Sequence, residues 1–277
     1  MSHTTILTAI FVLIGAMATS QSGLAMPAQS QSIGMHHLTP KPATPAPAPA
    51  DAQPEPEKET QSPAPIPKYT ALTPKEALVS PEDLEEWNHL SDAASAYTKT
   101  NLDKLVYIIE SDRGAVPPQG LFLAAKALAD QKQMEQAALY FFVGQLRLTF
   151  DVTRWPPRAN AEDIKRLKQD EKKSPDQASP NGNAAPRIDN PHAGITSIAN
   201  NISHPILVWA MKDPARLNAL MEKVKEWDAS APYAYDTGYP VNDPIPFDKW
   251  EKILPKVRED YFTRMNDLTK ALSKIKS

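Results

Sequence analysis

Histidine is the first residue type to consider for catalytic or metal chemistry, because it titrates near neutral pH and binds metals. Three histidines lie in the part of the chain that we expect to fold: His89, His192 and His204. No two of them stand four residues apart, as the ligands of a helical zinc site do. A catalytic histidine needs convergent partners, and the neighbouring sequence offers none. We therefore predict no catalytic, cofactor-binding or metal-binding residue.

Carboxylates occur in adjacent pairs, at Glu82 and Asp83 and again at Glu259 and Asp260. Neighbouring side chains on a helix point in different directions, so such pairs are typical of a solvated face. The sequence also lacks a glycine-rich phosphate loop and a Gly-x-Ser-x-Gly nucleophile motif. An envelope hydrolase would need two carboxylates at a fixed gap across a cleft, and it remains an alternative interpretation.

Aromatic residues in or near proline-containing stretches are our candidates for partner binding: Trp155, Tyr233, Tyr235 and Tyr239. Aromatic side chains presented from loops on a rigid helical scaffold are frequent binding hot spots. The alternative for the tyrosines is a place in the core. Trp209 and Trp227 fall in helical patterns, and we predict that both pack in the core.

Composition limits the class of protein before any motif is considered. The chain has 277 residues and a formal net charge of -3, whereas nucleic-acid binders carry a basic surplus. Nucleic acid is therefore not an expected partner. Hydrophobic residues make up 41%, which is enough for one ordinary core. The sequence has no cysteine, which excludes disulfides, thiolate metal sites and a cysteine nucleophile.

The first residues have the pattern of a bacterial export signal. Residues Ile6 to Ala18 are apolar or small except for Thr8, which is the length of a signal-peptide core and too short to span a bilayer. Gly23-Leu24-Ala25 offers a small-x-small cleavage site, so we predict a signal peptide over residues 1–25. The alternative is an uncleaved membrane anchor. The expected location is periplasmic or secreted, with no transmembrane span after cleavage.

Residues 26–72 form a segment rich in proline and alanine, with repeats such as Lys41 to Ala50 and Ser62 to Pro67. Alternating Ala-Pro favours extended polyproline II, because each proline fixes its own φ and restricts the residue before it. We predict a disordered linker that acts either as a semi-rigid tether or as a solvated tail.

Residues 73–277 carry the start signals of an α-helical domain. The motif Ser80-Pro81-Glu82-Asp83 predicts a helix that continues past Leu84 to Tyr97. Asn101 and Asp213-Pro214 predict two more helix starts. We expect His204-Pro205 to break a helix that begins near Asn190, and Pro255 to kink or begin a long final helix. Residues 174–190 are predicted to be a mobile loop.

The most informative stretch runs from Leu121 to Phe150. A helix rich in Ala and Leu precedes the polar turn at residues 130–133, and a second helix from Met134 is apolar on nearly every side. Small and large residues fall at the spacings of a tight helical hairpin: Ala124, Ala125, Leu128, Ala137, Phe141 and Gly144. This pattern resembles a tetratricopeptide-type hairpin. The resemblance implies an all-α array of antiparallel helical hairpins.

The sequence therefore predicts an exported helical module for protein-protein interaction, adaptor-like or chaperone-like, that meets another envelope protein. Export, the lack of catalytic motifs and the hairpin pattern motivate this interpretation. An immunity or inhibitor protein against an exported toxin is the second alternative, beside the envelope hydrolase.

Overall fold

A computed structural model describes residues 68–87, 92, 95, 101–159, 162, 165, 188–241 and 244–276. The predicted signal peptide, residues 26–67 of the predicted linker, His89 and residues 174–187 of the predicted loop lie outside these residues.

The described residues are helical, which confirms the predicted fold class at the level of all-α. The helices are α3 (Leu102–Ser111), α4 (Pro118–Asp130), α5 (Met134–Arg154), α7 (Ala193–Met211), α8 (Pro214–Ala229) and α9 (Trp250–Lys276). Two 3-10 turns accompany them, η1 (Pro81–Asp83) and η3 (Phe247–Lys249). Two very short strands, β1 (Arg158–Ala159) and β2 (Ile188–Asp189), pair antiparallel, with Arg158 opposite Asp189.

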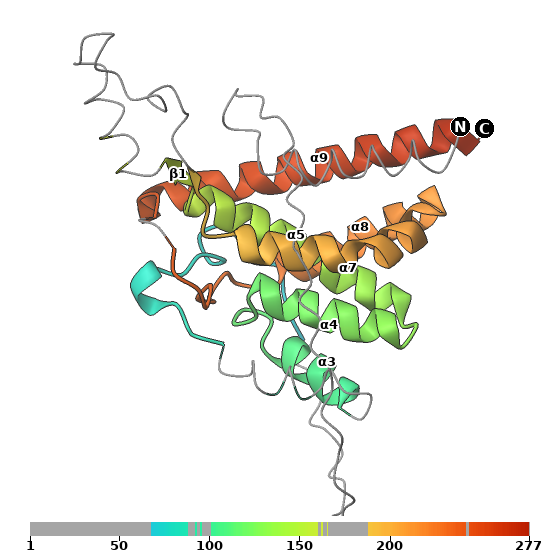
Figure 1. The fold of residues 1–277 in the computed structure, drawn as a ribbon, viewed down its shortest axis with the longest axis horizontal. Coiled ribbons are helices and arrows are strands. Elements are labelled where there is room, and N and C mark those ends of the chain that lie inside the picture. Colours follow the sequence, from blue (N-terminus) through green and yellow to red (C-terminus); the bar gives the residue numbers. More distant parts are fainter. Residues whose placement is uncertain are drawn as a thin grey trace, which may run out of the picture.

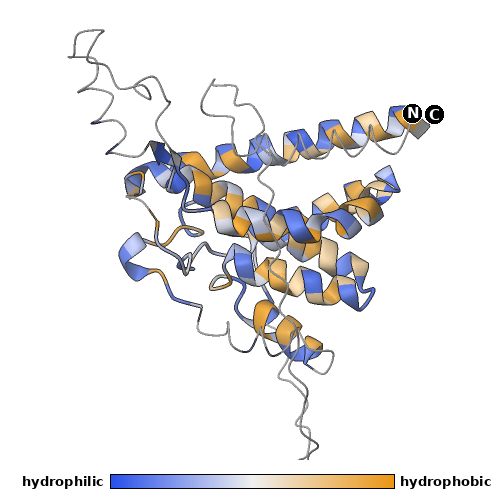
Figure 2. Ribbon diagram, in the orientation of Figure 1, coloured by the Kyte–Doolittle hydropathy of each residue, from blue (hydrophilic) through white to orange (hydrophobic). Residues whose placement is uncertain are grey.

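Helix α5 is the central element of the bundle. It contacts α4, α7, α8 and α9, and Figure 1 shows the helices stacked from α3 at one end to α9 at the other. Its residues Tyr140, Phe141, Phe142 and Val143 are all buried in succession, as the unbroken apolar run predicts. Burying each such side chain stabilises the fold by roughly 1.5–3 kcal/mol. Figure 2 shows apolar and polar patches alternating along α9.

Helices α4 and α5 form a tight hairpin, as predicted. The turn between them places Lys132 at a φ of 66°, the left-handed conformation that ends many helices. A Cβ atom added to Gly144 would lie 2.8 Å from the Phe122 ring, so only glycine allows this close approach of the two helices.

The helix predicted from Ser80 onward is not formed over residues 84–87. Only the 3-10 turn η1 follows Ser80, and the chain then extends. The Glu85 amide donates to the Ala234 carbonyl at 2.9 Å, and the Asp236 amide donates to the Glu85 carbonyl at 2.8 Å. These distant hydrogen bonds satisfy the backbone of Glu85 in place of a helix, so the local start signal is overridden.

The predicted break at Pro205 is also wrong, because α7 continues through this residue. Proline removes one helical hydrogen bond, to the carbonyl of Asn201. Asn201, His204 and Pro205 are all exposed, so water can reach the freed carbonyl. The start of α8 is confirmed, since Asp213 accepts a hydrogen bond from the Ala215 amide at 3.0 Å. Pro255 lies inside α9 and does not begin it.

No helix among the described residues combines the length and apolarity that crossing a bilayer requires.

Candidate functional site

Three charged residues lie on one face of the central helix: Arg147, Asp151 and Arg154. Their spacing of four and three residues places them one above another. All three are fully buried, and they face residues 233–239, which we call the tyrosine loop. A buried charge is costly unless it is paired or hydrogen-bonded, so each of these groups must find a partner inside the protein.

Arg147 is held by carbonyl groups and aromatic rings. Its guanidinium donates to the backbone carbonyls of Val116 and Pro232. The guanidinium carbon also lies near the centroids of three rings, at 5.0 Å from Trp227, 5.2 Å from Tyr233 and 4.9 Å from Tyr235. Cation–π contacts of this kind are strongest when water is excluded, as it is here.

Asp151 pairs with Arg154, whose Nη2 lies 2.8 Å from Oδ1 of the carboxylate. The Tyr235 hydroxyl donates to the same oxygen at 2.9 Å. Burial raises the pKa of Asp151, although the Arg154 guanidinium and the Tyr235 hydrogen bond oppose that rise. The guanidinium of Arg154 stacks on the Trp155 ring, 3.8 Å from its centroid.

Asp228 anchors the other tyrosine of this loop. It accepts from the Tyr233 hydroxyl and, at 2.6 Å, from Nε of Arg258 on α9. Burial lowers the pKa of Arg258, but the Asp228 carboxylate outweighs it and leaves that pKa raised. Asp228 and Arg258 therefore join the end of α8 to α9 through an ion pair that the tyrosine completes.

This arrangement corrects the expectation that Trp155, Tyr233 and Tyr235 are presented at the surface. All three are buried, and each of the two tyrosine hydroxyls donates a hydrogen bond to a carboxylate. These residues are buried because the charged side chains on α5 need polar and aromatic partners, and the tyrosine loop packs against α5 to provide them. Charged residues within a helix predicted to be buried on nearly every side were the sequence signal for this network.

Both ring nitrogens of His192 form hydrogen bonds within the protein. Its Nε2–H donates to the Trp155 carbonyl at 2.8 Å, because a carbonyl can only accept. Its Nδ1 therefore accepts from the Tyr239 hydroxyl, also at 2.8 Å. Burial lowers the pKa of His192 and favours the neutral imidazole. Tyr239 is only partly buried, so it alone of the four predicted partner-binding residues reaches the surface.

Two adjoining hollows open on the surface, the first beside the α4–α5 turn, α7 and α8, and the second between α5, α8 and the chain around Tyr69. The first measures about 510 Å³ and is lined by Lys132, Gln133, Met134, Glu135, Gln136, Leu139, Trp209 and Lys223. The second measures about 810 Å³ and is lined by Tyr69, Ala71, Arg113, Leu139, Lys223, Lys225, Glu226, Trp227, Ala229 and Ser230. They adjoin at Leu139 and Lys223, and we call the two hollows together the Trp209 groove.

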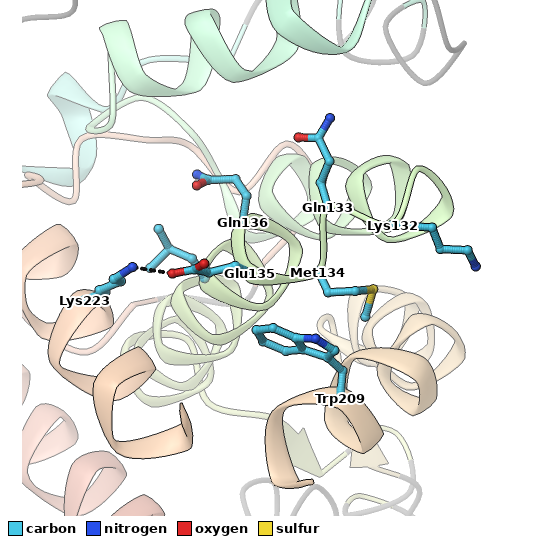
Figure 3. Close-up of a pocket in the computed structure, with 8 residues that line it drawn as sticks. Lys132, Gln133, Met134, Glu135, Gln136, Trp209 and Lys223 are labelled. Atoms are coloured by element: carbon cyan, nitrogen blue, oxygen red, sulfur yellow. Dashed lines mark hydrogen bonds and ion pairs between the residues drawn. The ribbon is translucent and has the colours of Figure 1, made fainter. Parts of the chain in front are cut away.

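Met134, Leu139 and Trp209 form the apolar part of the first hollow, and Figure 3 shows Met134 and Trp209 next to each other. Trp209 is only partly buried, whereas the other four tryptophans of the chain are buried. The prediction that Trp209 is a core residue therefore holds only for part of its surface. The guanidinium of Arg216 lies 4.5 Å from the Trp209 ring centroid and donates to the Trp209 carbonyl.

The part of the chain that the structure describes contains no cluster of three or more His, Asp or Glu placed to hold a metal ion. Comparisons of the chain with protein families, with curated proteins and with solved structures gave no match.

Proposed function

We propose that this chain is an exported helical module for protein-protein interaction, adaptor-like or chaperone-like, in a bacterial envelope. The observation that carries the proposal is the Trp209 groove, where a partly exposed tryptophan and a methionine lie at the edge of a closed bundle. Tryptophan is enriched among binding hot spots, and methionine adapts to many partner shapes. The buried aromatic residues already contact one another and the buried charges, so they are not available to a partner. The Trp209 groove is therefore the candidate binding surface.

The tetratricopeptide-type hairpin remains part of this proposal. The close contact of α4 and α5 at Gly144 supports it, as does the short turn that ends with Gln133. The first hollow lies directly beside this turn, so the hairpin would supply one wall of the binding surface.

The envelope location is tested by following the N-terminus. We expect the chain recovered from the periplasm to begin at Met26, after cleavage behind Ala25. Mass spectrometry of the intact protein measures this directly. A chain that stays in the cytoplasm with Met1 retained would contradict export.

The interaction itself is tested by capture from native envelope extract. The mature chain serves as bait beside two variants, Trp209→Ala and Val208→Ala, because Val208 is an exposed apolar residue on the same helix that lies outside the groove lining. We expect one stoichiometric partner on the wild type and on Val208→Ala, with about tenfold less on Trp209→Ala, a loss of about 1.4 kcal/mol. Equal capture by all three baits would show that the partner binds outside the Trp209 groove. The absence of any partner on a well-folded bait would contradict the proposal.

A further inference from the structure

Cations outnumber carboxylates among the residues that line the Trp209 groove. Its lining includes four cationic side chains, Lys132, Lys223, Lys225 and Arg113, and two carboxylates, Glu135 and Glu226. The chain as a whole carries a net charge of -3. Glu110 pairs with Arg113 and Glu222 pairs with Lys225, so the cations left to attract an anion lie at the Trp209 end of the groove.

Two of the cations around Trp209 are unpaired. Within the described residues, Lys132 and Arg216 form no ion pair with a carboxylate. Lys132 extends from the turn between α4 and α5, and Arg216 lies over the Trp209 ring. Two cations near Met134 and Trp209 are thus free to bind a carboxylate.

A third cation is paired only weakly. Lys223 contacts Glu135, as Figure 3 shows, and the side chains are 52% and 66% exposed. Exposed pairs of this kind contribute little and are screened by salt. A carboxylate from a partner can therefore take the place of Glu135 at Lys223 with little loss.

We propose that the Trp209 groove binds an acidic, amphipathic segment of a partner protein. An apolar side chain of that segment packs against Met134 and Trp209, while its carboxylates bind Lys132, Lys223 and Arg216. This inference rests on the proposed function and adds the chemistry of the ligand. Glu135 acts as a competitor that occupies Lys223 in the free protein, so its removal strengthens binding.

The test uses the mature chain and a fluorescent helical peptide of about four turns, with Leu along one face and Glu along the other. The control peptide carries Lys in place of every Glu. By fluorescence anisotropy at low salt, we expect the acidic peptide to bind about tenfold more tightly than the basic one, a difference of about 1.4 kcal/mol. Equal binding of both peptides, or tighter binding of the basic one, would overturn the inference.

Three single-charge variants locate the site. We expect Lys223→Gln to weaken binding of the acidic peptide by about fivefold and Glu135→Gln to strengthen it by about threefold. Lys256→Gln is the matched control, because Lys256 is exposed on α9 outside the groove lining, and it should leave the affinity unchanged. If Lys256→Gln weakened peptide affinity as much as Lys223→Gln, the peptide would be binding to the net charge of the protein alone. That result would overturn the assignment of the peptide to the groove.

Quenching of tryptophan fluorescence tests the charge of the groove without any peptide. Because Trp209 is the one tryptophan that is partly exposed, it dominates quenching by ions in solution. We expect iodide to quench it more strongly than caesium, and added salt to reduce the difference. Stronger quenching by caesium would contradict the inference. The proposed function would survive that result if capture of the partner still depended on Trp209.

The acidic residues 51–59 of this chain are the competing occupant. Deletion of these residues should leave peptide affinity unchanged if the groove serves a partner. A gain of about tenfold on deletion would assign the groove to the chain's own segment and would overturn the partner proposal.

Discussion

The interior around α5 and the Trp209 groove are built from the same residue types, arginine or lysine beside aromatic rings and carboxylates. They differ in access to water. In the interior, Arg147 and Arg154 are fully buried, and the hydroxyls of Tyr233 and Tyr235 each donate to a carboxylate. In the groove, the ion pair of Lys223 and Glu135 is more than half exposed. Buried charges are costly to separate, so their ion pairs serve the structure. Exposed ion pairs contribute little, so a ligand can replace one partner of the pair.

The largest expected effect comes from breaking the interior at Asp228. Asp228→Ala removes the carboxylate that accepts from Nε of Arg258 and from the buried Tyr233 hydroxyl. We expect a loss of about 3–5 kcal/mol in the free energy of unfolding, measured by urea denaturation. Glu251→Ala is the control, because Glu251 is an exposed acid on α9. A loss below about 1 kcal/mol would show that the pair behaves like a surface ion pair.

Removal of one hydroxyl from the interior should have a smaller effect. Tyr235→Phe keeps the ring over Arg147 and deletes the hydrogen bond to Asp151. Hydrogen bonds to charged groups contribute about 1.5–3 kcal/mol, and we expect a loss in that range by urea denaturation. Tyr239→Phe provides a comparison at a partly buried position, where the loss should be smaller. The reverse order would contradict the contrast between buried and exposed contacts.

The interior should also respond to acid through His192. Its pKa is lowered in the folded protein, so the unfolded chain takes up a proton first as the pH falls below about 6.5. Stability contributed by neutral His192 is therefore full above that pH and decreases toward pH 5, by at most about 1.4 kcal/mol per pH unit. Asp151 and Arg154 lie near this imidazole, and the raised pKa of Asp151 acts in the opposite direction.

His192→Gln isolates the histidine from these neighbours. The difference in unfolding free energy between wild type and variant should shrink as the pH falls from 7 to 5. A difference that is independent of pH would show that His192 titrates alike in the folded and unfolded chains.

The smallest effect is expected in the groove. Glu135→Gln removes an exposed ion pair, and we expect a change of about 0–1 kcal/mol in unfolding free energy. The same variant should change peptide affinity, as argued above. A stability loss comparable to that of Asp228→Ala would remove the distinction between the two regions.

Sequence patterns predict the elements that depend on local signals. The α4–α5 hairpin, the close contact at Gly144 and the capping residue Asp213 all follow from residues near one another in the chain. The interior network could not be predicted in this way, because its contacts join distant residues. Tyr235 and Asp151 are separated by 84 positions, and the helix signal at Ser80 is overridden by hydrogen bonds to the tyrosine loop.

The groove was missed for the same reason. Its apolar part joins Met134 at the start of α5 to Trp209 near the end of α7, and Lys223 comes from α8. An apolar residue at helical spacing predicts burial, but only the packing of neighbouring helices decides whether one edge stays exposed.

The parallel bridges of Leu78 with Tyr233 and of Glu85 with Tyr235 have a mechanical consequence. The chain that follows the proline-rich segment first binds the Glu110 carbonyl through the Tyr69 hydroxyl and the Ala229 carbonyl through the Leu72 amide. Farther along, it forms hydrogen bonds with the tyrosine loop. A pulling force applied ahead of Lys68 would load these attachments in order along the chain. The force would thus reach the ends of α3 and α8 first, through Tyr69 and Leu72, and only then the tyrosine loop and, through Tyr235, the buried charges of α5.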